Sequence, residues 1–209
     1  MSGQRRPYSS VARDRAREQV RARILDAAGE LFAPVWYDEV TLAGVAAAAG
    51  VSAQTVVNHF GGKIGLYRAA LTERFLPAVY AGRANTVAGE VDSIVPTVAA
   101  GYELYGDGTW RLLALAERIP DVRSVVVEGV AAHREWVRAM FAPLLVARAP
   151  ADAACIANLL TVALDVRTWR SLRRELGLGP DATRAFLTTL VHRILGSTPL
   201  TRPDRAAPR

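Results

Sequence analysis

Residues 41–63 read TLAGVAAAAGVSAQTVVNHFGGK, which predicts two short helices joined by a tight turn. Val45 and Ala49 are four residues apart, and so are Val56 and Phe60. Side chains four apart lie on the same face of a helix, so each helix has an apolar stripe that can pack against the other. The alternative reading of this stretch is a helical hairpin packed inside an ordinary bundle.

The turn between these helices has its own sequence signals. Gly50 can adopt the positive φ that often ends a helix, and Ser52 can cap the next helix by accepting a backbone N–H. The residues that then remain outward on the second helix are mostly short and polar, and they form a face about one helix wide. Such a face suits the major groove of B-DNA. These residues are Ala53, Gln54, Thr55, Val57, Asn58 and His59.

The N-terminal third of the chain resembles the TetR family of bacterial transcription regulators. The resemblance implies an all-α protein, with an N-terminal three-helix domain that contains a DNA-binding helix-turn-helix and a C-terminal helical domain for ligand binding and dimerisation. We therefore expect a DNA-binding domain at 1–76, a sensing and dimerising domain at 77–197 and a tail at 198–209. The matching residues, at the spacing that the family uses, are Leu31-Phe32, Tyr37, Thr41, Val45-Ala46, Ala49-Gly50-Val51-Ser52, Thr55-Val56, His59-Phe60, Lys63 and Leu66.

The resemblance also implies roles for single residues. Gln54 and Thr55 are expected to face base edges, while Ala53 and Val57 make apolar contacts to DNA. Phosphate contacts are expected from Thr41, Ser52, Asn58, His59 and Lys63.

Three positions depart from the family pattern. Trp36 stands where the family usually has the glycine that ends its first helix, so the loop at 34–40 is expected to differ. Val57 replaces a tyrosine that commonly points toward DNA, and the operator sequence therefore does not follow from the family. Gly61-Gly62 precede Lys63 where a Ser-Lys cap is usual, which predicts a next helix that begins with bare backbone N–H groups.

Positive charge is concentrated at the N-terminus. Residues 1–23 contain seven arginines against Asp14 and Glu18, so they carry +5 of the formal net charge of +6. Arginine side chains next to duplex DNA bind its phosphates, and the affinity that they add decreases as the salt concentration rises. For residues 1–10, which include Arg5 and Arg6, a DNA-contacting arm and a solvated tail are equal alternatives. The stronger phosphate-binding candidates lie on the leading turns of an amphipathic helix and are Arg13, Arg15, Arg17 and Arg21.

Helical periodicity continues after residue 76. Asp107-Gly108 predicts a turn, followed by a short helix from Trp110 to Ile119. Two apolar helices, at about 153–176 and 181–195, have more apolar surface than one monomer would cover. TetR-like proteins dimerise through such a pair in a four-helix bundle, so we expect a homodimer, with simple core packing as the alternative.

TetR-like proteins also enclose a ligand cavity, and occupation of that cavity releases DNA. Residues on the helices that would surround such a cavity are candidates for ligand contact, each with core packing as its alternative. They are Tyr102, Tyr105, Trp110, His133, Trp136, Met140, Asn158 and Trp169. Such a lining suits a small apolar or amphipathic molecule. We therefore expect a repressor that binds a palindromic double-stranded DNA operator as a homodimer and is released by an effector.

Composition and motifs argue against several other classes. With 51% hydrophobic and 22% charged residues, the chain can bury a substantial core. Cys155 is the single cysteine, which excludes an intramolecular disulfide framework. Phosphate-binding loops, nucleophile elbows and zinc-ligand spacings do not occur, so we expect no enzyme, cofactor or metal site.

The ends and apolar runs of the chain bear on its location. The N-terminus lacks an apolar signal core, and the longest apolar run, 153–164, is too short to cross a bilayer. We therefore expect a cytoplasmic protein with no membrane partner. The remaining alternative is a helical protein that binds a membrane surface or a protein partner, because the Arg-rich first helix could meet anionic lipid as well as DNA.

Overall fold

The computed structural model describes residues 8–196, with side-chain surroundings from residue 11 onward. The predicted contacts of Arg5 and Arg6 and the predicted tail at 198–209 lie outside the described residues. Within the described range every regular element is a helix, which confirms the all-α prediction. None of the helices within that range is long and apolar enough to cross a membrane.

The chain divides into two compact units. Unit 1 contains the chain up to Ala81 together with Arg111–Val126, and unit 2 contains Gly82–Trp110 and the chain from Val127. Helices α6 (Val91–Ala116) and α7 (Pro120–Leu145) therefore each contribute residues to both units. Nothing in the sequence pattern predicted that Arg111–Val126 would pack with the N-terminal helices.

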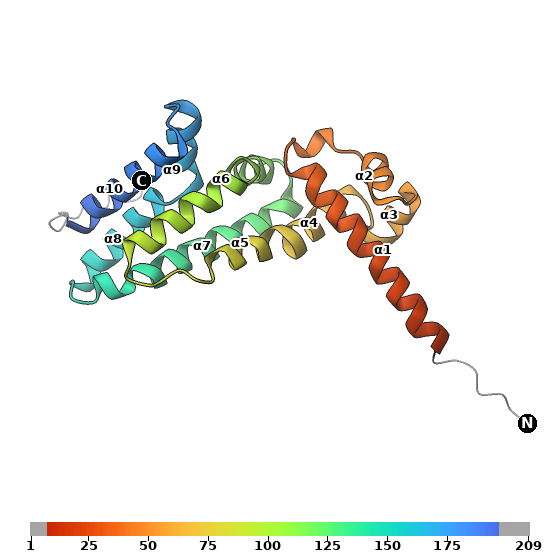
Figure 1. Cartoon of the computed structure of the whole chain (residues 1–209), viewed down its shortest axis with the longest axis horizontal. Helices are drawn as coiled ribbons and strands as arrows, with labels where there is room; N and C mark the ends of the chain where they lie inside the picture. The colour runs from red at the N-terminus through yellow and green to blue at the C-terminus, as the bar shows by residue number, and fades with distance from the viewer. Residues whose placement is uncertain (1–7, 197–209) are drawn as a thin grey trace, which may run out of the picture. The chain divides into compact units, whose positions relative to one another are not determined.

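Unit 1 is built around the predicted helix-turn-helix (Figure 1). The longest of its helices, α1, packs against α2 and α4, and α3 also packs against both of these. The core contains fully buried side chains from each helix, such as Ile24, Val45, Val56 and Leu66, and Leu115 from the second segment joins them. The elements are α1 (Tyr8–Phe32), the 3-10 turn η1 (Tyr37–Glu39), α2 (Leu42–Ala49), α3 (Ala53–Phe60), α4 (Lys63–Ala70), the π-helical turn η2 (Leu71–Phe75) and the first residues of α5 (Leu76–Arg83).

The loop after α1 closes without the usual glycine. The N–H of Ala33 donates to the carbonyl of Gly29 at 3.2 Å, which completes the last turn of α1. Trp36 then has a φ of −71°, a conformation open to any residue, and its N–H donates to Glu39 Oε1 at 3.1 Å. Because no positive φ is needed here, a tryptophan is accommodated at this position.

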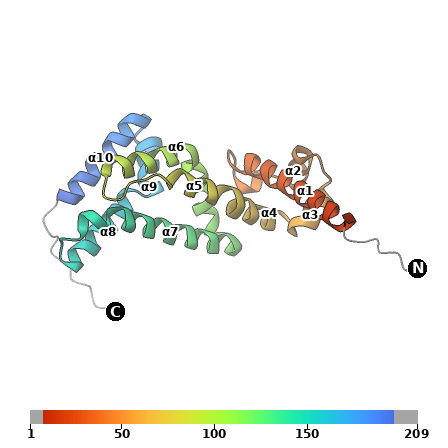
Figure 2. The same ribbon diagram turned by 60° about the horizontal axis from the view of Figure 1, so that its bottom comes forward.

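Unit 2 contains the remaining helices, several of which are labelled in Figure 2. Its core is formed by buried apolar side chains such as Ile94, Val98, Phe141, Leu160 and Leu187. Helix α8 packs against α10. Besides parts of α6 and α7, the elements of this unit are α8 (Pro150–Ala163), α9 (Val166–Arg170), the π-helical turn η3 (Ser171–Glu175) and α10 (Pro180–Gly196).

Two predicted element boundaries in this region are wrong. The predicted turn at Asp107-Gly108 and the separate helix after it are parts of the continuous α6, and Asp107 is held there by Arg174, whose Nη2 lies 2.6 Å from its carboxylate. The predicted helix at 153–176 is interrupted after Ala163. Asp165 accepts the N–H of Arg167 at 2.8 Å and so caps a new helix, α9.

Candidate functional site

The connection between α2 and α3 has the cap geometry predicted from the sequence. Gly50 adopts the left-handed conformation, with φ 66° and ψ 41°, and the N–H of Val51 donates back to the carbonyl of Ala46 at 2.9 Å. Ser52 Oγ accepts the N–H of Thr55 at 3.1 Å and caps α3. These hydrogen bonds fix the direction in which α3 leaves the turn.

One side of α3 is anchored and the other is exposed. Val56 is fully buried in the core of unit 1. Of the residues predicted to contact DNA, Ala53, Gln54 and Asn58 are exposed, whereas Thr55, Val57 and His59 are half-buried. Gln54 Nε2 donates to Asn58 Oδ1 at 3.0 Å, so these two exposed amides are paired with each other. The structure thus brings the predicted base-facing residues together around the exposed side of one short helix.

The junction of α3 with α4 depends on three glycines. Gly61 has a φ of 75° and Gly62 a φ of 148°, both of which disfavour any other residue. As predicted, α4 begins without a side-chain cap. A Cβ on Gly65 would lie 2.0 Å from the backbone oxygen of Phe60, so the first turn of α4 and the end of α3 are in close backbone contact. The residue pattern around Gly65 did not predict this contact.

Two predicted phosphate-binding residues already have intramolecular roles. Thr41 Oγ1 accepts the N–H of Gly44 at 3.0 Å and caps α2, which leaves its hydroxyl hydrogen available as a donor. Lys63 Nζ lies 3.3 Å from the carbonyl oxygen of Asp38 and 4.3 Å from the centre of the Tyr37 ring. In this structure the Lys63 ammonium therefore links α4 to η1.

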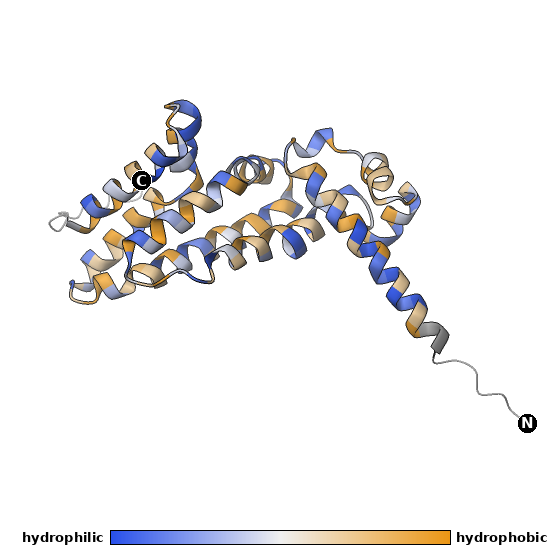
Figure 3. Cartoon of the chain, in the orientation of Figure 1, coloured by the Kyte–Doolittle hydropathy of each residue, from blue (hydrophilic) through white to orange (hydrophobic). Residues whose placement is uncertain are grey.

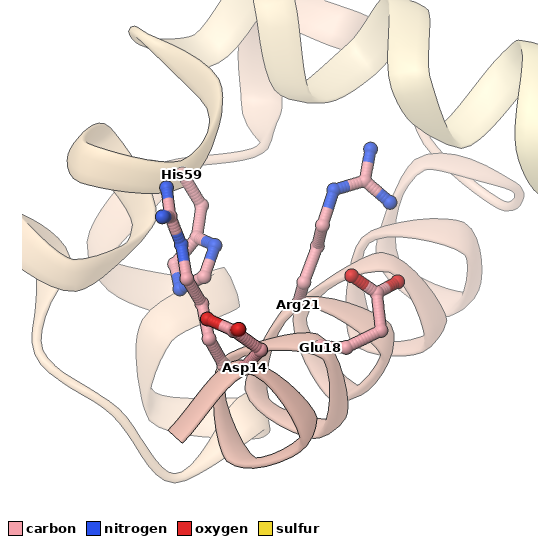
Figure 4. A pocket seen from close by; sticks show the side chains of 5 residues that line it. Asp14, Glu18, Arg21 and His59 are labelled. Atoms are coloured by element: carbon pink, nitrogen blue, oxygen red, sulfur yellow. The ribbon is translucent and has the colours of Figure 1, made fainter. Parts of the chain in front are cut away.

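A hollow between α1 and α3 carries charges of both signs (Figure 4). Its lining residues are Asp14, Arg17, Glu18, Arg21 and His59. The residues of α1 from 11 to 19 are all exposed, and Figure 3 shows these turns as mostly hydrophilic. Because two carboxylates face the same hollow as two arginines, it is not a uniformly positive surface.

Comparison with known proteins identifies the helix-turn-helix. Residues 24–70, which run from within α1 to the end of α4, match the model of the family described as bacterial regulatory proteins, tetR family. Residues 24–70 therefore form a TetR-family DNA-binding domain. No curated protein matches the sequence.

Two solved structures share the fold of this chain. A tetR-family transcriptional regulator from Streptomyces coelicolor has a TM-score of 0.66 and 21% sequence identity, over 85% of this chain and 79% of that one. A TetR-like transcriptional regulator from Rhodococcus sp. RHA1 has a TM-score of 0.57 and 20% identity, over 86% of this chain and 97% of that one. The likeness extends well beyond the helix-turn-helix.

Four of the residues predicted to contact a ligand form two aromatic pairs, and both pairs have Leu164, Arg83 and Asp165 as neighbours. Tyr102 and Trp169 lie together, with ring centres 6.0 Å apart. Trp169 is only 1% exposed, and its Nε1–H donates to Glu103 at 2.8 Å. Tyr102 donates its hydroxyl to the carbonyl of Leu164 at 3.0 Å, and burial raises its pKa above the usual value.

A second pair is formed by His133 and Trp136, whose rings stack with centres 6.5 Å apart. The Arg83 guanidinium lies 4.5 Å from the centre of the Trp136 ring and contacts His133 as well. Of the other four candidates, Tyr105 is half-buried, Trp110 lies beneath the Arg170 guanidinium at 4.8 Å, Met140 packs against the unit 2 core as Tyr102 and Trp136 do, and Asn158 is exposed on α8.

The tautomer of His133 follows from its partner. Arg83 Nη2 lies 3.0 Å from His133 Nδ1, and a guanidinium can only donate, so Nδ1 accepts and Nε2 carries the hydrogen. Nε2 is buried and makes no regular hydrogen bond among the described residues, although the backbone of Leu164 is close enough to oppose part of the lowering of the pKa of His133. Burial, reinforced by the charge of Arg83, lowers the pKa of His133 from 6.5 to about 4. The imidazole is therefore neutral in the folded protein at neutral pH.

His133 should make folding depend on pH. Below pH 6.5 the His133 imidazole becomes protonated in the unfolded chain, whereas in the folded chain it stays neutral until the pH approaches 4. The free energy of unfolding therefore falls as the pH falls from 6.5 to 4. The shift corresponds to about 3 kcal/mol of unfolding free energy. Urea denaturation at several pH values should show a shallower decline for His133→Gln than for the wild type. The matched variant His192→Gln, at an exposed position on α10, should keep the wild-type decline; equal declines in all three would contradict this account.

Proposed function

We propose that this protein is a TetR-family regulator that binds a palindromic DNA operator as a homodimer, represses transcription there, and is released by a small apolar or amphipathic effector. It acts in the cytoplasm and by binding alone. The observation that carries the proposal is the exposed side of α3, which is anchored by Val56 and oriented by the caps at Gly50 and Ser52. A short helix held in this way can enter a major groove with its side chains on base edges.

The geometry of unit 1 supports distinct roles in DNA binding. The Gln54 amide can donate to and accept from an adenine edge, and Val57 can contact a thymine methyl group. The Thr41 hydroxyl can donate to a phosphate, because its oxygen already accepts a backbone N–H. Ser52 Oγ lies 2.9 Å from Thr55 Oγ1 as well, so the Ser52 hydroxyl can donate to a phosphate when Thr55 is the donor of that pair. Ala53 and Thr55 complete the base-facing set, and Asn58, His59 and Lys63 complete the phosphate-facing set.

The exposed sides of α8 and α10 support dimerisation. Val162 on α8 is 66% exposed and Phe186 on α10 is 48% exposed. Asn158 lies one helical turn before Val162 and is exposed as well, so its position fits a subunit interface better than a ligand cavity. Pairing of α8 and α10 with the same helices of a second copy would cover these residues.

Side chains in unit 2 support the proposed effector class. Tyr102 supplies aromatic surface and is backed by the buried Trp169, while His133 and Trp136 place a polar edge beside a second aromatic ring. Aromatic surface with few polar groups suits a small amphipathic molecule. Release requires a difference of only about 1–3 kcal/mol between the effector's affinities for the DNA-bound and free arrangements. A dimer bound at a promoter blocks polymerase, so repression is the outcome that we propose.

Selection from a random duplex DNA library tests the proposal. The wild-type protein should enrich an inverted repeat, because two copies related by a twofold axis read two equal half-sites. Gln54→Ala should relax the preference at one position of each half-site, with a cost of about 1–3 kcal/mol for the preferred base. Lys63→Ala should instead weaken binding to all sequences and lower the slope of log affinity against log salt by about one.

Each variant can contradict its assigned role. If Gln54→Ala lowered the affinity for all DNA sequences equally, Gln54 would contact the DNA backbone instead of a base. If Lys63→Ala lowered thermal stability and left the salt slope unchanged, its contact with η1 would be its main role. Failure of the wild type to enrich any sequence would overturn the proposed function.

A further inference from the structure

We propose that Arg21 is a positioning residue for α3: paired with Glu73, it holds the carboxyl end of α3 against α1 and η2 instead of binding a DNA phosphate. The functional part of this inference rests on the proposed reading of DNA by α3. It differs from the role expected from the sequence, in which Arg21 was a phosphate-binding candidate.

The contact between Arg21 and Glu73 is bidentate. Nη1 and Nη2 of Arg21 each lie 2.6 Å from one carboxylate oxygen of Glu73. The two side chains are 28% and 38% exposed, so the pair is partly shielded from water. This fork-to-fork arrangement fixes both position and orientation, which a single hydrogen bond does not. The pair therefore joins α1 to η2 with a defined geometry.

The same guanidinium also contacts the end of α3. Its central carbon lies 5.2 Å from the centre of the ring of Phe60, the last residue of α3. Arginine over an aromatic face at this distance makes an attractive cation–π contact. One side chain of α1 thus contacts two other elements of unit 1, η2 and α3, and Figure 4 shows Arg21 in the hollow that it shares with His59 of α3.

A second ion pair joins the same two elements. Arg74 Nε lies 2.7 Å from Asp26 Oδ1. Glu73 and Arg74 are neighbours on the π-helical turn η2. The acidic Glu73 binds the basic Arg21 of α1, and the basic Arg74 binds the acidic Asp26 of α1. Single π-helical turns are often found at functional positions. The two pairs restrain rotation of η2 against α1, and Arg21 extends that restraint to α3.

The charges of the pair explain why the Arg21 guanidinium is not available to bind a DNA phosphate. The hydrogen bonds from Arg21 lower the pKa of Glu73, and those from Glu73 raise the pKa of Arg21, so both groups stay ionised. A phosphate would have to compete with a carboxylate already in bidentate contact. Arg21 therefore contributes no free positive charge to the DNA-facing surface.

Glu73→Gln separates positioning from charge. If only the charge near DNA mattered, removal of a carboxylate would strengthen binding, whereas a positioning role predicts weaker binding. We expect Glu73→Gln and Arg21→Gln each to lower affinity for the selected operator about tenfold, with unchanged salt slopes. The double variant should lose little more than either single variant. The control Glu30→Gln removes the same charge from an exposed position on α1 and should bind as the wild type does.

Hydrogen exchange without DNA tests the positioning itself. The Gly61 N–H donates to the carbonyl of Val57 at 2.7 Å and closes the last turn of α3. Its exchange should accelerate about tenfold in Glu73→Gln and Arg21→Gln, and not in Glu30→Gln. Unchanged exchange, or tighter DNA binding by Glu73→Gln, would overturn the inference. If the wild type bound no operator, the proposed function would fail, but the exchange rates would still decide the role of Arg21.

Discussion

Gly65→Ala should abolish sequence-specific DNA binding and destabilise unit 1 by about 3 kcal/mol or more. The added Cβ would lie 2.0 Å from the oxygen of Phe60 and 3.2 Å from its carbonyl carbon. Both contacts are with backbone, so no side-chain rotation can relieve them. Because Phe60 ends α3, any movement that makes room displaces the helix that carries Gln54.

Gly29→Ala is the matched control for this substitution. Gly29 also lies inside a helix of unit 1, but a Cβ there would meet no atom within 4 Å. Alanine is the better helix former, so this variant should be more stable than the wild type by about 0.5–1 kcal/mol and should bind DNA normally. Urea denaturation and mobility shift on the selected operator measure both effects. Wild-type binding by Gly65→Ala would show that the contact between α3 and α4 does not position the DNA-binding surface.

Trp169→Ala should destabilise unit 2 by about 3–5 kcal/mol, the usual loss when a large buried aromatic side chain is truncated. Trp169 is 1% exposed and hydrogen-bonded to Glu103, and a Cβ on Gly106 would come within 2.4–2.7 Å of its ring. The ring therefore fills a space that the glycine leaves open in α6. Removal of the ring leaves a cavity and takes one of two donors from Glu103 Oε1, which keeps its hydrogen bond from Arg173 Nε at 2.8 Å.

Thermal unfolding followed by circular dichroism measures this loss. Leu104→Ala is the matched control, because Leu104 lies on the same helix as Gly106 and is 74% exposed. Its effect should stay within about 0.5 kcal/mol. A loss below about 1 kcal/mol for Trp169→Ala would favour the other reading of this residue, in which its ring lines open space for a ligand.

The helix-turn-helix was predictable because its determinants are local. Neighbouring residues in the sequence show the glycine at the helix end, the serine cap and the apolar residues four apart. In the structure Gly50, Ser52 and Val56 have the predicted roles. The order of these signals along the chain also made the family resemblance specific. The DNA-contact roles assigned to single residues depend on the duplex itself, and they stay predictions.

Long-range pairing explains the errors in the second half of the chain. Asp107 and its neighbouring glycines have low helix propensity, so the local pattern favoured a turn. In the structure Arg170 and Arg174 lie 3.6 and 2.6 Å from the Asp107 carboxylate, and the helix continues. Those partners are more than 60 residues away along the chain, and no local pattern predicts such a contact. The break at Asp165, by contrast, has a local signal in its capping carboxylate.

The candidate site contained determinants that the sequence pattern did not reveal. Gly65 lies inside a helical pattern, and an isolated glycine there is a signal of close backbone approach that could have been used. Arg21 was placed correctly on the first helix, but it lies near the middle of α1, and its bond to Glu73 depends on how α1 meets η2. The position of Asn158 on the exposed side of α8 likewise required the packing of α8 against α10.

The hydrogen bond between Gln54 and Asn58 has a consequence for how operators can change. Each amide restrains the rotamer of its neighbour, so replacement of either side chain also releases the other. The base preference at the position proposed for Gln54 should therefore depend on the residue at 58, although Asn58 itself is proposed to contact a phosphate. A switch to a new operator would then need compensating substitutions at both residues.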